Sequence, residues 1–368
     1  MIALGAISIA PFDSGWLAAA IVLTTPVLLT AIGELISERA GVLNVGLEGM
    51  MISGAFVAYF AMVETQSLAL AAAMGVLGGV AFAVVMALLA IEARADQVVA
   101  GIGINLMAIG LTSYLFQQKF GGEARAEVDR VGKIEIPLLS DIPGIGPALF
   151  DHDPFVYFAF MLVPASWFLL YRTRWGLAIR ASGELPAAAD TAGVSVRRVR
   201  WGGVLTAGAL AGLGGAYLVI AAVGIFADEL SAGRGFLALI AVIFGRWHPA
   251  GVLAACLLLG GADALRIRLT LLGDVPRIFW VVLALVAIVY LVRLFLAHRA
   301  RGQKRTNGFV LAVAVVGLLF AAITPHIDVP PQFWRTLPYL IGLLALAAAV
   351  TRARMPTRLA YPYRRGEG

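Results

Sequence analysis

The sequence of 368 residues contains one cysteine, Cys256, which excludes an intramolecular disulfide framework. Lysine is nearly as scarce, since only Lys119, Lys133 and Lys304 occur. The one Gly-Lys pair, Gly132-Lys133, lacks both the earlier glycine and the hydroxyl residue of a phosphate-binding loop. The chain is therefore not expected to hydrolyse ATP by itself.

Other signs of catalytic chemistry are also missing. The four histidines are scattered along the chain, and none has the spacing of a zinc site. No nucleophile elbow and no pair of catalytic carboxylates stands out. The sequence therefore predicts a protein that is not an enzyme, with no catalytic residue, no metal and no cofactor of its own.

Charge is sparse at 14% of residues, whereas hydrophobic residues make up 61% and the mean hydropathy is +0.90. This composition indicates an integral membrane protein, with residues 1–368 forming a single membrane domain. The net charge of +6 does not indicate nucleic-acid binding. Most arginines flank apolar runs, where orientation in the membrane and contact with anionic lipid explain them.

Apolar runs long enough to cross a bilayer predict an all-α polytopic membrane protein with about 10 transmembrane helices. A shorter apolar piece at 235–245 cannot cross untilted, so it is predicted to be a half-helix or re-entrant segment covered by protein or water. The predicted spans are 16–36, 42–63, 67–91, 97–117, 154–171, 201–224, 249–267, 276–296, 308–324 and 335–350.

Arginine clusters at 172–200, 293–305 and 352–365 predict the cytoplasmic side. All three fall on that side if 235–245 and 249–267 form a hairpin, which places the C-terminus inside and the N-terminus outside. Arg234, Arg266, Arg268 and Arg277 run against this bias. The loop 118–153 is then external, as either a contact for an extracytoplasmic partner or a solvated connection.

One polar segment interrupts the apolar chain, with the sequence RTRWGLAIRASGELPAAADTAGVSVRRVR at 172–200. Pro186 suits a first helical position and Gly193 suits a helix stop, so 186–192 should form about two turns. Two turns are not stable alone in water. This short helix is therefore expected to dock into a partner.

Small residues occur at the spacing of helix-packing motifs. Gly75 and Gly79 form one GxxxG pair, and Gly208 and Gly212 form another. Such pairs allow close approach of helix backbones in a membrane. They predict a packed bundle and carry no information about a substrate.

Polar residues within apolar runs are candidates for a translocation pathway. Asn44 and Glu48 have i, i+4 spacing, which places them on one face of the predicted helix. Glu48 could instead lie near the inner interface, paired with Arg39 or capping backbone. Asn105 could hydrogen-bond a neutral polar solute or make an interhelical hydrogen bond. For Asp263, a structural salt bridge with Arg266 is expected.

Four stretches resemble a known family: ELISERAGVLNVGLEGMMISGAF at 34–56, DQVVAGIGINLMAIGLTSYLF at 96–116, GLAIRASGELPAAADTAGV at 176–194 and GRGFLALIAVIFGRWHPAG at 233–251. Together they are similar to permease subunits of ABC importers, in the branched-chain amino acid and simple-sugar permease family. Within it, the nucleoside-type subgroup is the nearest match. The resemblance covers roughly residues 16–275, and the end of the chain is also similar.

The resemblance implies a multi-pass subunit in the bacterial inner (plasma) membrane that forms the pathway for nucleosides or simple sugars. Its partners would be a second homologous permease, an ABC ATP-binding subunit that binds ATP, and an extracytoplasmic substrate-binding lipoprotein. The ATPase-coupling loop would comprise Gly183, Glu184, Pro186, Ala188, Asp190 and Gly193.

The chain departs from the family pattern at two places. Leu185 stands where relatives have asparagine, a good N-cap, so contacts to the partner would have to hold the helix more firmly. Residues 276–330 look like inserted spans between the family core, 1–275, and a last span with a basic tail, 331–368. The alternative function is an ion-coupled secondary transporter of a small polar solute, with Glu34, Glu48 and Asp263 as candidate coupling groups.

Overall fold

The computed structural model describes residues 14–121, 127–143, 145–228, 230–272 and 355–364, with isolated positions between 288 and 342. Within this part of the chain, seven helices are long and apolar enough to cross a membrane. They are α1 (Ser14–Arg39), α2 (Leu47–Thr65), α3 (Leu68–Ala87), α4 (Gln97–Phe120), α6 (Pro154–Arg172), α9 (Val196–Tyr217) and α11 (Pro249–Leu272). Each of the first seven predicted spans corresponds to one of these helices, although the second begins at Leu47 and not at 42. The predictions at 276–296 and 308–324, and most of 335–350, lie outside the described residues.

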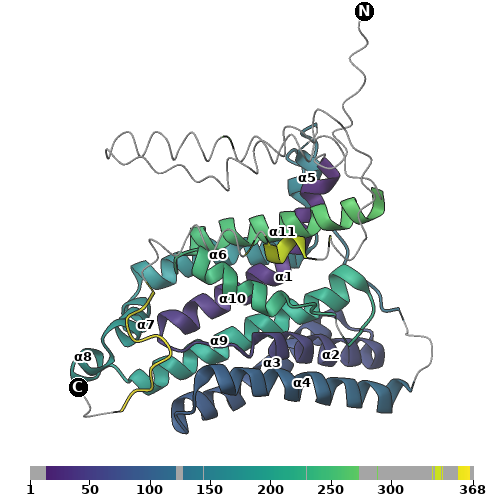
Figure 1. The fold of residues 1–368 in the computed structure, drawn as a ribbon. Helices are drawn as coiled ribbons and strands as arrows, with labels where there is room; N and C mark the ends of the chain where they lie inside the picture. The colour runs from purple at the N-terminus through teal and green to yellow at the C-terminus, as the bar shows by residue number, and fades with distance from the viewer. Residues whose placement is uncertain are drawn as a thin grey trace, which may run out of the picture.

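The bundle centre is formed by α1, α2, α3 and α9, which run side by side (Figure 1). Glycines bring α3 and α9 into backbone contact, as the GxxxG pairs predict. A Cβ added to Gly79 would lie 2.1 Å from the backbone oxygen of Gly208. Gly212 similarly approaches α2, since a Cβ added to Gly54 would lie 2.4 Å from the Cα of Gly212. No side chain fits at these contacts.

Two long helices end in π-helical turns, η2 (Leu88–Glu92) after α3 and η3 (Leu218–Val223) after α9. Part of the loop 118–153 packs against the second of these. Val131 donates its backbone N–H to the oxygen of Ile220, and Val128 donates to Gly224. The loop also holds α5 (Gly146–Phe150) and a two-stranded hairpin of β1 (Ile134–Glu135) and β2 (Asp151–His152). Some of this loop is thus structural cover for the end of α9.

The predicted half-helix is present as α10 (Arg234–Phe244), which has 11 residues and packs against α11 as a hairpin. At 1.5 Å per residue its length is about 16 Å, roughly half of a hydrocarbon core. The described residues before it, 224–228 and 230–233, form turns and irregular backbone and no regular helix. They carry Phe226, which is fully buried against Tyr59 and Phe116. Protein therefore covers this irregular backbone, as a membrane requires.

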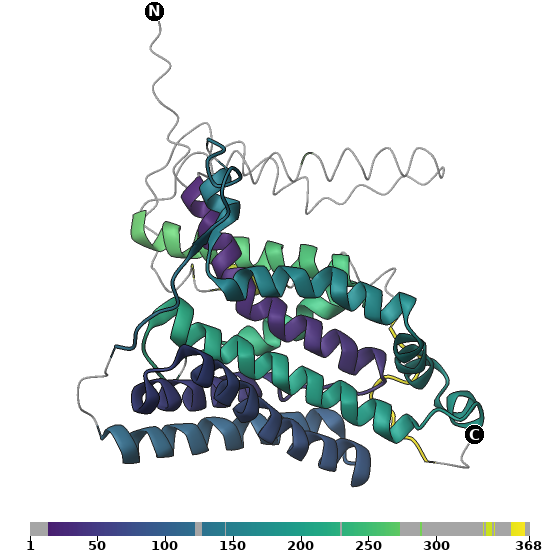
Figure 2. The ribbon, with the colours of Figure 1, turned by 180° about the vertical axis from the view of Figure 1, so that it is seen from behind.

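Two short helices, α7 (Arg174–Glu184) and α8 (Pro186–Thr191), lie at one end of the bundle together with the tail segment 355–364. Figure 2 shows the same grouping from behind, with the two short teal helices and the yellow tail segment at one end of the bundle. The arginine cluster in 172–200 and the described tail arginines, Arg358 and Arg364, therefore lie at a common end, as predicted. This group of segments is called the arginine-rich end below.

Candidate functional site

At the arginine-rich end, α8 forms as predicted, beginning at Pro186. Its N-cap residue, Leu185, makes no side-chain hydrogen bond to the helix and is 63% exposed. Gly193 follows the helix with φ of +86°, a left-handed conformation that L side chains rarely adopt. Within the helix, Ala188 is exposed while Asp190 is half-buried. The short helix thus leaves Leu185 and Ala188 accessible to a partner.

The junction between α7 and α8 is fixed to the end of α1. Ser182 donates its hydroxyl to the backbone oxygen of Ala40 at 3.0 Å. Gly183 is buried, and a Cβ added there would lie 2.3 Å from the backbone oxygen of Arg39. Because the backbone at Gly183 contacts the backbone at the end of α1, a displacement of this junction must also displace α1.

The tail segment 355–364 packs onto the same junction, a contact that the sequence did not predict. Glu184 Oε2 accepts hydrogen bonds from the backbone N–H of Thr357 at 3.1 Å and from its hydroxyl at 2.7 Å. The backbone N–H of Arg358 donates to the oxygen of Gly183 at 2.9 Å. The predicted loop residue Glu184 is therefore bonded to the tail.

A second polar group lies inside the bundle, where α2 begins. The prediction that Asn44 shares a helical face with Glu48 is wrong, because α2 starts only at Leu47. Residues 42–46 are non-helical, after Gly41 with φ of +96°. Asn44 is fully buried there, and its side-chain oxygen accepts from the backbone N–H of Gly46 at 3.0 Å. Its amide stabilises a turn in place of a helical turn.

Glu48 caps the start of α10. Its Oε1 accepts from the backbone N–H of Gly233 at 2.8 Å, and its Oε2 accepts from that of Gly235 at 2.7 Å. The carboxylate thus meets the positive end of the half-helix dipole and two of its free donors. This is the backbone-capping alternative considered for Glu48. Pairing with Arg39 does not occur, since Arg39 donates to the backbone oxygen of Trp247 at 2.9 Å.

Asn105 ties α4 to the start of α2. Its side-chain oxygen accepts from the backbone N–H of Gly49 at 2.8 Å, and its amide donates to the oxygen of Val45 at 2.9 Å. Both ends of the amide therefore bond to backbone of another segment, which is the interhelical alternative. Whether Asn44, Glu48 and Asn105 line a pathway stays a prediction.

Two further acids of α1, Glu34 and Glu38, are completely buried beside this group. Glu34 Oε1 accepts from the backbone N–H of Asn44 at 2.8 Å, and Glu38 accepts from the indole N–H of Trp247. Trp247 lies in the turn between α10 and α11. Sequence reasoning missed Glu38, although its i, i+4 spacing from Glu34 was a visible signal. The pair connects the end of α1 to both the irregular segment 42–46 and the α10–α11 turn.

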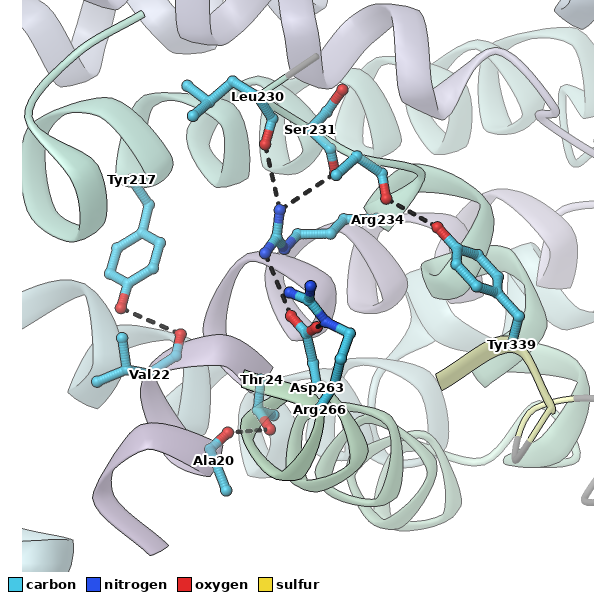
Figure 3. Close-up of polar contacts among 11 residues, drawn as sticks. Ala20, Val22, Thr24, Tyr217, Leu230, Ser231, Arg234, Asp263, Arg266 and Tyr339 are labelled. Carbon is cyan, nitrogen blue, oxygen red and sulfur yellow. Dashed lines mark hydrogen bonds and ion pairs between the residues drawn. The ribbon is translucent and has the colours of Figure 1, made fainter. Parts of the chain in front are cut away.

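An ion-pair cluster lies where the irregular segment 224–233 meets α10 (Figure 3). Asp263 of α11 accepts from Arg266 at 2.6 Å and from Arg234 at 3.2 Å. Arg234 also donates to the backbone oxygen of Leu230 at 3.1 Å. The Asp263–Arg266 salt bridge is confirmed, and Arg234 is an additional partner. One carboxylate shared by two guanidinium groups leaves a local charge of +1.

An open apolar cleft of about 630 Å³ is lined by residues of α1, α3, α6 and α9. Its lining includes Leu162 and Leu169 of α6 and Leu205 and Leu210 of α9, with Ser166 and Thr206 as the polar side chains. It does not contact the polar groups described above. Among the described residues, no cluster of three or more potential metal ligands occurs.

Taken together, a bundle of apolar crossings, a broken span and a docked pair of short helices define a multi-pass membrane transport component. The sequence matches the family described as branched-chain amino acid transport system / permease component over residues 16–346. The chain belongs to this family of permease components, and it is a transport subunit of the bacterial inner (plasma) membrane. No solved structure matches the chain.

Three curated relatives are similar to this chain at 38–39% identity. A guanosine ABC transporter permease protein of Bacillus subtilis is 39% identical over 71% of this chain and 85% of its own length. A nucleoside ABC transporter permease protein of Lactococcus lactis is 39% identical over 65% and 78%. A putative glucose ABC transporter permease protein of Haloferax volcanii is 38% identical over 95% and 96%. The chain is therefore similar to permease subunits of ABC transporters, which are transport components and not catalysts.

Proposed function

We propose that this permease subunit belongs to an ATP-driven importer for nucleosides or simple sugars. The relatives named for guanosine, nucleosides and glucose support that solute class. A separate ABC ATP-binding subunit would bind and hydrolyse ATP, so the chain itself needs no cofactor. A second homologous permease and an extracytoplasmic substrate-binding lipoprotein would complete the assembly.

The observation that carries the proposal is the rigid connection between α8 and α1. The short helix α8 has no N-cap of its own and is too short to be stable alone. Its preceding junction nonetheless touches the end of α1 through Ser182 and Gly183. A partner that grips α8 would therefore move α1 directly.

From α1 the movement has a defined route into the bundle. Glu34 bonds the irregular segment before α2, and Glu38 bonds the turn between α10 and α11. Both α2 and α10 begin at this polar group, where Glu48 joins them. Closure of the ATPase would thus shift α1, then α2 and α10 together, and change which side the pathway opens to.

The proposed pathway runs beside Asn44, Glu48 and Asn105. Their polar side-chain atoms bond backbone within the protein, apart from the Asn44 amide nitrogen, which donates to the Met50 sulfur. They would therefore shape the wall of the pathway and leave cargo recognition to other groups. The ion-coupled alternative draws no support from the three relatives above, which are named as ABC transporter permeases.

The test is uptake by the complete complex in proteoliposomes. We expect transport of a nucleoside or sugar only with ATP, the ATP-binding subunit and the loaded binding protein. A matched complex whose ATP-binding subunit carries an inactivated phosphate-binding loop should be silent. Solute uptake by the permeases alone, driven by a proton or sodium gradient, would contradict the proposal.

A further inference from the structure

The tail segment 355–364 is held in a defined shape by the residues at the base of α8. Its two anchors on Glu184 and Gly183 were given above, and a third comes from α9. Arg200, only 2% exposed, donates Nη1–H to the backbone oxygen of Tyr361 at 2.8 Å. A buried guanidinium bonded to a backbone oxygen fixes the tail at a point distant from its first anchors.

The same end of the bundle has a set of large exposed apolar side chains, on α7, at the junction before α8 and on the tail. The members are Trp175 at 75%, Leu177 at 61%, Leu185 at 63%, Met355 at 61% and Tyr361 at 57%. Exposed apolar groups beyond the membrane-spanning helices indicate an interaction site. Pro356 of the tail, next to Met355, is buried, so the tail packs onto the junction between α7 and α8.

The charge of this surface points to the chemistry of its partner. Of the eight arginines in 172–200 and 355–364, six are exposed (Arg172, Arg174, Arg197, Arg198, Arg358 and Arg364), and Arg197 is paired with Glu92. The two acidic residues, Glu184 and Asp190, are half-buried. Glu184 is occupied by Thr357. The surface therefore presents apolar side chains within a strongly basic surround, which complements an acidic protein face with an apolar centre.

We propose that the tail segment 355–364 is part of the docking surface for the ATP-binding subunit, jointly with α7 and α8. This rests on the proposed function and adds a second contact segment to it. Glu184 then acts as a positioning residue, since it holds the tail in place instead of being presented to the partner. The ordered backbone contacts favour a protein partner, because a lipid headgroup would not require a surface of fixed shape.

Site-directed crosslinking in the assembled complex tests the proposal. Leu185→Cys on α8 and Tyr361→Cys on the tail would each be treated with a thiol crosslinker. Cys256 is fully buried and stays as it is. Tyr114→Cys is the control, since Tyr114 is 63% exposed. It lies in the C-terminal part of α4, whereas the Glu92–Arg197 ion pair places the start of α4 nearer to the arginine-rich end.

We expect both Leu185→Cys and Tyr361→Cys to link to the ATP-binding subunit, and Tyr114→Cys not to. A link from Leu185→Cys alone would overturn the joint surface and leave the docking role of α8 intact. Links from neither would also contradict the proposed function. Labelling of Tyr361→Cys only by a lipid-phase reagent would assign the tail to the membrane surface and overturn the inference.

A double-mutant cycle tests the positioning role of Glu184. Thr357→Val and Glu184→Gln each weaken the link to the tail, and each should reduce the ATP-binding subunit retained on the purified permease about fivefold. Because the two residues act through the same contact, the double variant should lose little more. Thr65→Val is the control, since its hydroxyl bonds Ala61 at the far end of α2. Fully additive losses would contradict the positioning role.

Discussion

The two short helices α8 and α10 solve the same problem in different ways. Neither has a side-chain cap from its own N-cap residue, Leu185 for α8 and Gly233 for α10. The first donors of α10 lie inside the bundle, where Glu48 of another helix binds two of them. The cap position of α8 is open to solvent, where water satisfies such donors. A helix start in a membrane protein must be capped when buried, whereas an exposed one can be left weak and therefore responsive.

The largest expected effect comes from removing the buried cap. Glu48→Ala leaves two backbone N–H groups of α10 without acceptors in an apolar interior, which should cost on the order of 3 kcal/mol or more. We expect a large loss of folded protein from membranes and a much lower unfolding temperature in detergent. Glu48→Gln keeps one acceptor and should recover part of the loss. Normal stability of Glu48→Ala would show that α10 does not depend on this carboxylate.

The next effect is at Asn105, which supports the same helix junction from α4. Asn105→Ala removes the hydrogen bonds to Gly49 and Val45, and should lower the free energy of unfolding by about 1–2 kcal/mol. Cargo preference should stay unchanged, because the amide is already occupied by backbone. Uptake competition and thermal unfolding measure the two properties. A changed cargo preference at unchanged stability would instead give Asn105 direct contact with the solute.

At the exposed helix, substitution should affect coupling more than folding. Gly193→Val places a branched side chain at φ of +86°, a strain of about 1–2 kcal/mol that should distort the exit from α8. We expect normal membrane levels with strongly reduced ATP-driven uptake. Gly202→Val is the matched control, since nothing lies within 4 Å of an added Cβ there and its φ is ordinary. Equal uptake by both variants would remove the coupling role of this turn.

The smallest expected effect is an increase in the stability of α8. Leu185→Asn supplies the N-cap that α8 lacks, which should stabilise the helix by roughly 1 kcal/mol. A better-ordered α8 should depend less on the tail, so the Thr357→Val defect in retaining the ATP-binding subunit should shrink in this background. The comparison of Thr357→Val with and without Leu185→Asn measures this directly. An unchanged defect would mean that the tail does not order α8, whereas complete rescue would contradict the contact proposed above between the tail itself and the ATP-binding subunit.

Hydropathy, together with the proline and glycine residues that begin and end helices, predicted the local features of this fold. Apolar length placed the seven described crossings, and the shortness of 235–245 identified α10 as a half-helix. Pro186 and Gly193 bounded α8 to within a residue or two. These features depend on neighbouring residues, which is why the sequence alone was sufficient.

The misplaced features depend on contacts between distant residues. The segment 42–46 was extended into a helix because its apolar residues suit one, whereas Gln97, Glu34 and Asn105 bind its backbone in a non-helical form. The same applies to the tail on Glu184, which lies 173 positions away in the chain. Hydropathy carries no signal for such pairs. For the candidate site, residue types were therefore predictable and their partners were not.

The glycine contact between α3 and α9 constrains how the protein can change shape. With backbone against backbone at Gly79 and Gly208, no layer of side chains remains to yield or reorient between these two helices. The two helices must therefore move together as one rigid unit. Movement is easier on a neighbouring face of α9, where leucines of α6 and α9 line the open cleft. The close glycine contact between α3 and α9 therefore determines which parts of the protein can move relative to one another.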